Sequence, residues 1–300
     1  MYEQIAANRR RSALLIVGFV VLVVAVGWAF DVLIGGGGVA VLVAVAVAIA
    51  MSIGAYFGSD RIALAMSHAQ PADPVEYRRY HNLVDGLCIA AGLPKPRLYV
   101  IDDPAPNAFA TGRNPDHAAL AVTTGLLDRM NRVELEGVLA HELSHVRNRD
   151  ILVTTISVVL VGVVVLVADW ALRFLWWGGP RHRDDSRDGR GAGSALGVVG
   201  LVLVVLAPIA AQLMHFAVSR RREALADFSA VQLTRYPPGL VAALEKLRDD
   251  TTVVHSGSRA TAHLWIESPL DRASGRGAWL NRLFNTHPPL EDRIEALKEL

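Results

Sequence analysis

The chain has 300 residues, 30 basic and 29 acidic, and this balance gives no reason to expect nucleic acid as a partner. Hydrophobic residues make up 52% and gather in long runs, the composition of a membrane protein rather than a soluble domain. The single cysteine, Cys88, excludes an internal disulfide, and its helical spacing from apolar neighbours predicts a core position rather than a reactive thiol.

Two uncharged runs of nineteen residues lie near the N-terminus. Three arginines precede the first run, Ser12–Phe30, and a glycine-rich turn leads into the second, Val39–Phe57. Nineteen apolar residues are enough to cross a bilayer core of about 30 Å. A secretory signal peptide, the alternative, has a shorter apolar run and a small-x-small cleavage site. We therefore predict an uncleaved transmembrane hairpin over residues 1–58.

Residues 59–150 have the composition of a soluble domain. Apolar residues recur at helical spacing from Tyr77 to Ala91, which predicts a helix that starts near Asp73 and ends at the glycine after Ala91. Two short β-prone runs, Arg97–Ile101 and Ala118–Thr124, are predicted strands, and Asn107–Gly112 is predicted as a loop. This part should therefore be an α+β domain with a small sheet.

The next predicted helix carries a motif typical of metal sites. Asn131 and Glu134 have the spacing of a capping box, which indicates where the helix begins. His141 and His145 then lie one turn apart and about 40° apart around the axis, so both rings can reach one metal ion. Glu142 between them is the usual general base of a zinc hydrolase. The alternative is that the histidines are polar surface beside a membrane.

Two more apolar runs, 151–168 and 195–218, predict a second transmembrane or partly inserted hairpin over residues 151–218. With four spans, the N-terminal arm, residues 59–150 and residues 219–300 lie on one side of the membrane. These segments carry 3, 10 and 12 basic residues, whereas the turn in the first hairpin has none, so they are predicted to be cytoplasmic. Four arginines in the turn of the second hairpin are a weak objection.

The topology also predicts a third metal ligand, because catalytic zinc is usually bound by three protein ligands. The third span begins six residues after His145, and the fourth ends five residues before Glu223, so these residues should be neighbours. Glu223 is therefore the predicted ligand. Asp227, on the same helical face, is predicted to accept the second ring N–H of a ligating histidine. The alternative is that both acids only pair with Arg220–Arg222.

These motifs resemble those of HtpX-type membrane-bound zinc metalloproteases, which are relatives of the CAAX prenyl endopeptidases. The resemblance covers nearly the whole length: the N-terminal hairpin, Asn107-Ala108-Phe109-Ala110-Thr111-Gly112, His141 to Asp150, Ser219 to Asp227, and Thr286-His287-Pro288-Pro289 through Arg293. It implies a gluzincin-like protease domain in which one Zn²⁺ per chain is bound by His141, His145 and Glu223, with Glu142 as the base. Ala224 stands where an aromatic residue is common in the family.

Other roles are more open. The resemblance places His287 near the site, where it could donate to the tetrahedral oxyanion, but it could equally only cap the last helix. Asn107 could clamp a substrate or be a plain turn residue. The Asn107–Thr111 segment and the Ala118–Thr124 strand could bind an extended peptide along an exposed sheet edge. Arg293 is expected to anchor the final helix electrostatically.

We therefore expect a mainly α integral membrane protein with four transmembrane helices and a gluzincin-like α+β cytoplasmic domain, split into residues 59–150 and 219–300. The resemblance implies a zinc endopeptidase in a bacterial-type plasma membrane that hydrolyses misfolded or damaged membrane proteins in quality control and stress response. Thr251–Arg276 is predicted to be a mobile loop with one short helix near His263–Ile266, and the resemblance implies that this loop is open to self-cleavage. A non-catalytic membrane scaffold and a protease of prenylated proteins are the alternatives.

Overall fold

The computed structural model describes residues 2–34, 37–157, 220–254, 256, 261, 264–266 and 289–300. Several predictions fall on other parts of the chain. The third span beyond residue 157, the whole fourth span, most of the Thr251–Arg276 loop and His287 lie outside the described residues.

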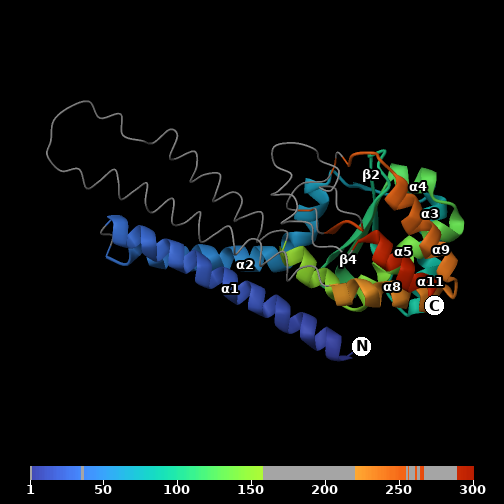
Figure 1. The fold of residues 1–300 in the computed structure, drawn as a ribbon. Coiled ribbons are helices and arrows are strands. Elements are labelled where there is room, and N and C mark those ends of the chain that lie inside the picture. Colours follow the sequence, from blue (N-terminus) through green and yellow to red (C-terminus); the bar gives the residue numbers. More distant parts are fainter. Residues whose placement is uncertain are drawn as a thin grey trace.

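The first two helices form a long hairpin that extends away from the body of the protein (Figure 1). Helix α1 (Tyr2–Ile34) and helix α2 (Val39–Met66) contain the predicted spans and continue beyond them. Gly38, with φ of 95°, precedes α2, and its N–H donates to Asp31 over 2.8 Å. Among the described residues, one helical stretch, Val41–Met66, is long and apolar enough to cross a membrane by length and composition.

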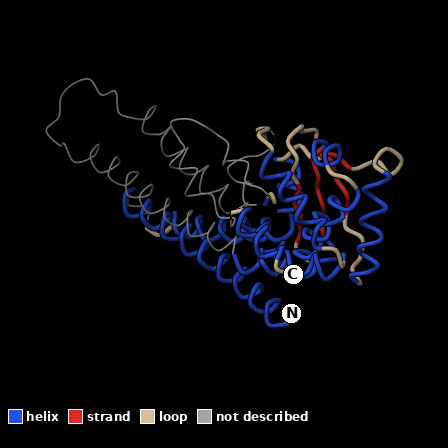
Figure 2. The backbone as a smooth tube through the Cα atoms, turned by 45° about the vertical axis from the view of Figure 1, so that its right-hand side comes forward, coloured by secondary structure: helices blue, strands red, loops and turns tan. Residues whose placement is uncertain are grey.

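A four-stranded sheet lies in the body, covered by helices (Figure 2). Its spatial order is β1-β2-β4-β3, in which β2 and β4 are parallel and the two outer pairings are antiparallel. The strands are β1 (Gln70–Pro71), β2 (Arg97–Ile101), β3 (Ala108–Gly112) and β4 (Ala118–Thr123). Both predicted strands are therefore confirmed.

The predicted loop at Asn107–Gly112 is wrong, because Ala108–Gly112 forms strand β3. All five of its residues pair with β4, from Ala108 opposite Val122 to Gly112 opposite Ala118. The pairing is set by a neighbouring strand rather than by local propensity, since alanine and glycine are weak strand formers. The pairing also corrects the expectation that the Ala118–Thr124 strand binds a peptide along an exposed edge. Strand β4 is paired on both sides and offers no edge to a peptide, whereas β3 is an outer strand of the sheet.

Helix α3 (Arg78–Ala91) packs on one face of the sheet and begins later than predicted. The Asp73 side chain accepts from the N–H groups of Val75 and Glu76, which holds residues 73–77 in a turn. Gly92, with φ of 65°, ends the helix as predicted. Cys88 is buried in the core, also as predicted, and burial raises the pKa of its thiol to about 11.

The remaining described helices build the body around helix α5, which carries the two histidines. They are α4 (Thr124–Arg129), α5 (Arg132–Arg147), α8 (Arg220–Thr234), α9 (Pro237–Asp249) and α11 (Leu290–Lys298), with a 3₁₀ turn at Pro115–His117. The predicted capping box is present: Asn131 accepts from the Glu134 N–H, and Glu134 accepts from the Asn131 N–H. Pro237 and Pro238 occupy the first turn of α9, where proline is favoured.

The two faces of the sheet contact different parts of the chain. Leu120 and Val122 of β4 point into the main core with the apolar residues of α3 and α5. Ala121, on the opposite face of β4, packs with Phe109, with Trp265 and with Leu64 near the end of α2. Because α2 continues past the predicted end of its span, it joins the α1–α2 hairpin directly to the sheet.

Gly137 tests this packing, because it lets α5 lie directly against the start of α9. A Cβ at Gly137 would lie 2.8 Å from the Leu240 nitrogen and 2.9 Å from its Cα, and these backbone atoms cannot move aside cheaply. We expect Gly137→Ala to lower the free energy of unfolding by about 1–3 kcal/mol, measured as a fall in the melting temperature.

Gly86 on α3 is the matched control, since a Cβ there has nothing within 4 Å. Gly86→Ala should leave stability unchanged or raise it by up to about 1 kcal/mol. Equal melting temperatures for the two variants would contradict the packing described.

Candidate metal centre

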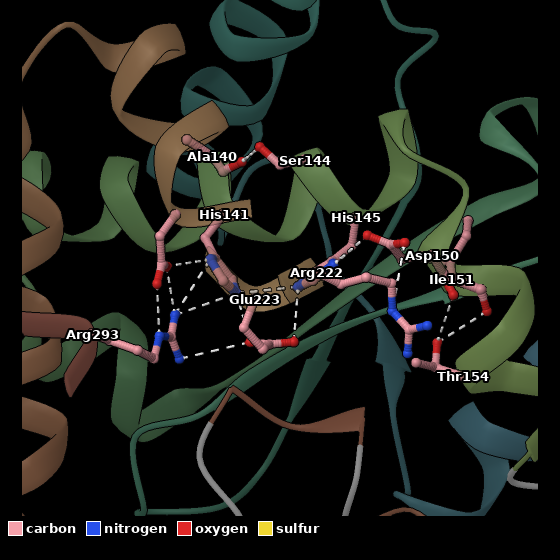
Figure 3. Close-up of polar contacts among 11 residues, drawn as sticks. Ala140, His141, Ser144, His145, Asp150, Ile151, Thr154, Arg222, Glu223 and Arg293 are labelled. Atoms are coloured by element: carbon pink, nitrogen blue, oxygen red, sulfur yellow. Dashed lines mark hydrogen bonds and ion pairs between the residues drawn. The ribbon is translucent and has the colours of Figure 1, made fainter. Parts of the chain in front are cut away.

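Three side chains from two helices converge on one point (Figure 3). His141 and His145 lie on α5, and Glu223 lies in the first turn of α8. The two Nε2 atoms are 3.2 Å apart, and each is 3.6 Å from an oxygen of the Glu223 carboxylate. One donor atom from each residue lies within 4.8 Å of the others. The prediction that Glu223 lies beside the two histidines is confirmed.

This donor set fits zinc. Two imidazole nitrogens and one carboxylate oxygen are the ligands of a common type of catalytic zinc site, which keeps a fourth position for water or substrate. The two rings are nearly perpendicular, at 87°, with centroids 4.8 Å apart, so both Nε2 atoms can approach one ion. Their Nδ1 atoms face other partners, which fixes the tautomer that zinc requires.

The Nδ1–H of His141 donates to Asp227, 2.8 Å away on α8. Arg293 of α11 binds the same carboxylate with two nitrogens, at 2.7 and 2.9 Å. Burial lowers the pKa of His141, but the Asp227 charge together with the hydrogen bonds to Asp227 and Glu223 outweighs it and raises the pKa to about 9. Burial raises the pKa of Asp227, and the Arg293 charge with His141 overcomes this and lowers it to about 2. The contact predicted for Asp227 is present.

The Nδ1–H of His145 donates to Asp150, 3.1 Å away, and Arg222 lies 3.7 Å from the other oxygen of that carboxylate. Burial lowers the pKa of His145, while the hydrogen bond to Asp150 raises it, and the net shift is upward. Sequence reasoning missed Asp150. Arg149, with φ of 58°, interrupts the helix just before Asp150, which no periodic pattern indicates.

The alternative from the sequence is that Glu223 and Asp227 only pair with Arg220–Arg222. The structure gives partners for Asp227 and Arg222 that can be compared with it. Asp227 pairs with His141 and Arg293, and Arg222 lies beside Asp150. Arg293 does anchor the final helix electrostatically, as expected, and its contact with Asp227 also links that helix to His141.

Glu142 is 2% exposed and lies on α5 between the two histidines. Burial raises its pKa, while the charges of His141 and His145 and the backbone N–H of Ala110 lower it, with a net upward shift. A carboxylate of raised pKa, held next to three groups that could hold a metal ion, has the basicity and the position of a general base.

The outer edge of β3 lies against this site, because the Ala110 N–H points toward Glu142. On the same edge, the Ile266 N–H donates to the Ala108 carbonyl over 3.0 Å. Asn107, at the start of the strand, is 1% exposed, and its side-chain oxygen accepts from the Ala108 N–H. A substrate contact by Asn107 stays a prediction.

A family model and two relatives agree with this chemistry. The model of "Peptidase family M48" matches residues 74–300. A "Protease HtpX homolog" of Caldanaerobacter subterraneus subsp. tengcongensis is 43% identical over 301 residues, which cover 100% of this chain and 98% of the relative. Another, of Lactobacillus helveticus, is 42% identical over 303 residues, with full coverage of both chains. The crystal structure of S. mikatae Ste24p shares 16% identity at a TM-score of 0.47, covering 99% of this chain and 67% of that one.

The raised pKa of His141 makes zinc binding depend on pH. Below pH 9 the metal-free ring is protonated, so zinc must displace a proton to bind at Nε2. Affinity should therefore increase by about tenfold or more per pH unit from pH 6 to 8, measured by competition with a chelating dye whose own pH dependence is known.

Asp227→Asn removes the charge that raises the pKa of His141. In this variant, the rise of zinc affinity with pH should shift to lower pH. The zinc affinity of the variant at high pH should also be weaker. A zinc affinity that is flat across this pH range in the unsubstituted protein would contradict the assignment.

Proposed function

Because the chain belongs to peptidase family M48, we propose that His141, His145 and Glu223 bind its catalytic zinc and that Glu142 is the general base. The enzyme is a zinc metalloprotease that acts on peptide bonds. The observation that carries the residue assignment is the convergence of three donor atoms beside Glu142, each histidine being held by a buried carboxylate on its far nitrogen.

Zinc held by His141, His145 and Glu223 would supply a Lewis acid to polarise the attacking water and the scissile carbonyl. In the proposed mechanism, Glu142 accepts the proton of the water and then delivers it to the leaving amine. The raised pKa of Glu142 helps the first step, since a stronger base removes the proton more readily, and the protonated carboxyl then donates to the amine as the C–N bond breaks. His287 stays our proposed donor to the oxyanion.

For the substrate we propose an extended peptide added along the outer edge of β3. This edge runs past Glu142, since the Ala110 N–H points toward that carboxylate. A strand added there would place a scissile bond near the base and the metal ligands. The Ile266 N–H now contacts part of this edge, so residues 264–266 would have to move for a longer peptide to bind. Asn107 would then lie at one end of the bound strand.

The enzyme is associated with a membrane, and the exposed surface of the hairpin supports this. Bulky apolar side chains on α1 and α2 are 44–72% exposed, among them Leu14, Val17, Leu42, Val43 and Val47. We propose that four spans anchor the chain in a bacterial-type plasma membrane, as a hairpin at 1–58 and another at 151–218. The protease parts, 59–150 and 219–300, would face the cytoplasm. Damaged or misfolded membrane proteins are the proposed substrates.

Glu142→Gln tests the proposed base directly. The substitution keeps the size of the side chain and removes its basicity, so hydrolysis of casein should fall by about 10²–10⁴-fold while zinc remains bound. Glu136→Gln is the matched control, because Glu136 lies on the same helix outside the site and should leave hydrolysis unchanged. Casein hydrolysis that continued at the control rate in Glu142→Gln would remove the protease mechanism proposed here.

Single cysteines test the proposed orientation. In a Cys88→Ala background, Val39→Cys places the single cysteine at the turn of the hairpin. Asp249→Cys places it on the exposed end of α9. An impermeant maleimide should label Val39→Cys in intact cells and Asp249→Cys only after the membrane is opened. The opposite pattern would place the protease body outside the cell.

A further inference from the structure

Residues 150–157 form a helix that directly follows the histidine helix α5 and contacts two parts of the site. At its start, Asp150 accepts the hydrogen bond from His145. One and a half turns later, Thr155 reaches strand β3. Both residues are buried, at 2% and 0% exposure.

Thr155 holds the end of β3 through its hydroxyl oxygen. That oxygen accepts from the Gly112 N–H over 3.2 Å and lies 3.0 Å from the hydroxyl of Thr111. Gly112 and Ala110 are two residues apart on the strand, so their N–H groups point to the same side. Thr155 therefore occupies the outer edge of β3 one step beyond the N–H that faces Glu142.

The rest of this short helix packs against the membrane hairpin. Leu152, Val153 and Ile156 form a buried cluster with Leu15 and Phe19 of α1. At 100° per residue, Thr155 lies about 140° around the axis from Asp150. Measured from Asp150 in the same direction, the three apolar residues lie between about 200° and 300°. The helix therefore directs its polar contacts to the site and its apolar face to α1.

We propose that residues 150–157 position two parts of the active site at once, with Asp150 orienting His145 for the metal and Thr155 fixing the substrate edge of β3. The packing of α1 against this helix supports both contacts. The Asp150 part depends only on the metal site, whereas the Thr155 part rests on the proposed binding of substrate along β3. Asp150 and Thr155 are positioning residues, since neither touches the reacting atoms.

Asp150→Asn tests the first contact on the full-length protein in detergent. The amide keeps the shape but loses the charge that holds the His145 N–H, so the dissociation constant for zinc should rise at least tenfold. Asp150→Glu should recover part of the affinity. Asp249→Asn removes an exposed carboxylate from α9 and should bind zinc as the unsubstituted protein does.

Thr155→Val tests the second contact, with Thr155→Ser as the control that keeps the hydroxyl. Valine leaves the buried Gly112 N–H without its acceptor. Amide exchange at residues 108–112 should speed up at least tenfold and KM for peptide substrates should rise about fivefold or more. Zinc affinity should stay within about twofold, and serine should restore the exchange rate.

Phe19→Ala tests the support from α1. Phe19 is 1% exposed in the cluster, whereas Val17 on the same helix is 59% exposed. Removing the Phe19 ring should weaken zinc binding and raise KM together, while Val17→Ala should change neither.

Three results would overturn the proposal. They are unchanged zinc affinity in Asp150→Asn, unchanged exchange in Thr155→Val, and unchanged zinc affinity and exchange in Phe19→Ala. If the zinc-loaded, unsubstituted protein cleaved no peptide, the proposed function would fail instead. Zinc affinity and amide exchange would still decide whether residues 150–157 act as described.

Discussion

A buried charge is costly unless it is paired, and this constraint organises the body of the protein around two histidines. Each histidine that faces the metal position has a carboxylate behind it, and each carboxylate has an arginine beside it. Behind His141 lies Asp227, and Arg293 binds the Asp227 carboxylate through two short hydrogen bonds. His145 is followed by Asp150, with Arg222 at a longer distance. Removing one member would leave its neighbour buried without compensation.

The two chains of contacts draw on separate parts of the sequence. Asp227 and Arg293 come from α8 and α11, on the C-terminal side of the second predicted hairpin. Asp150 begins the helix that starts the third predicted span and packs on α1. The candidate metal centre of this M48 metalloprotease thus contacts the C-terminal helices directly and the α1–α2 hairpin through residues 150–157. Such a site cannot form from the histidine helix alone.

The parts of this arrangement that follow local rules could be predicted from sequence. The spacing of His141 and His145 is a property of one helix, and the Asn131–Glu134 capping box marks its start. Glu223 could be found because the apolar spans restrict which residues can meet. Strand β3 and Asp150 could not. The pairing of β3 with β4 is a tertiary contact, and Asp150 reaches His145 only because Arg149 adopts a left-handed conformation.

The proposed chemistry rests on one zinc ion bound by His141, His145 and Glu223. X-ray absorption at the zinc edge, with metal analysis of the purified protein, measures it most directly. We expect about one zinc per chain, bound by two imidazole nitrogens at about 2.0–2.1 Å and by oxygen at about 2.0–2.2 Å, without sulfur. Glu223→Ala should lose at least tenfold in affinity. Full zinc occupancy at unsubstituted affinity in that variant, or a shell with one imidazole, would exclude this set of ligands.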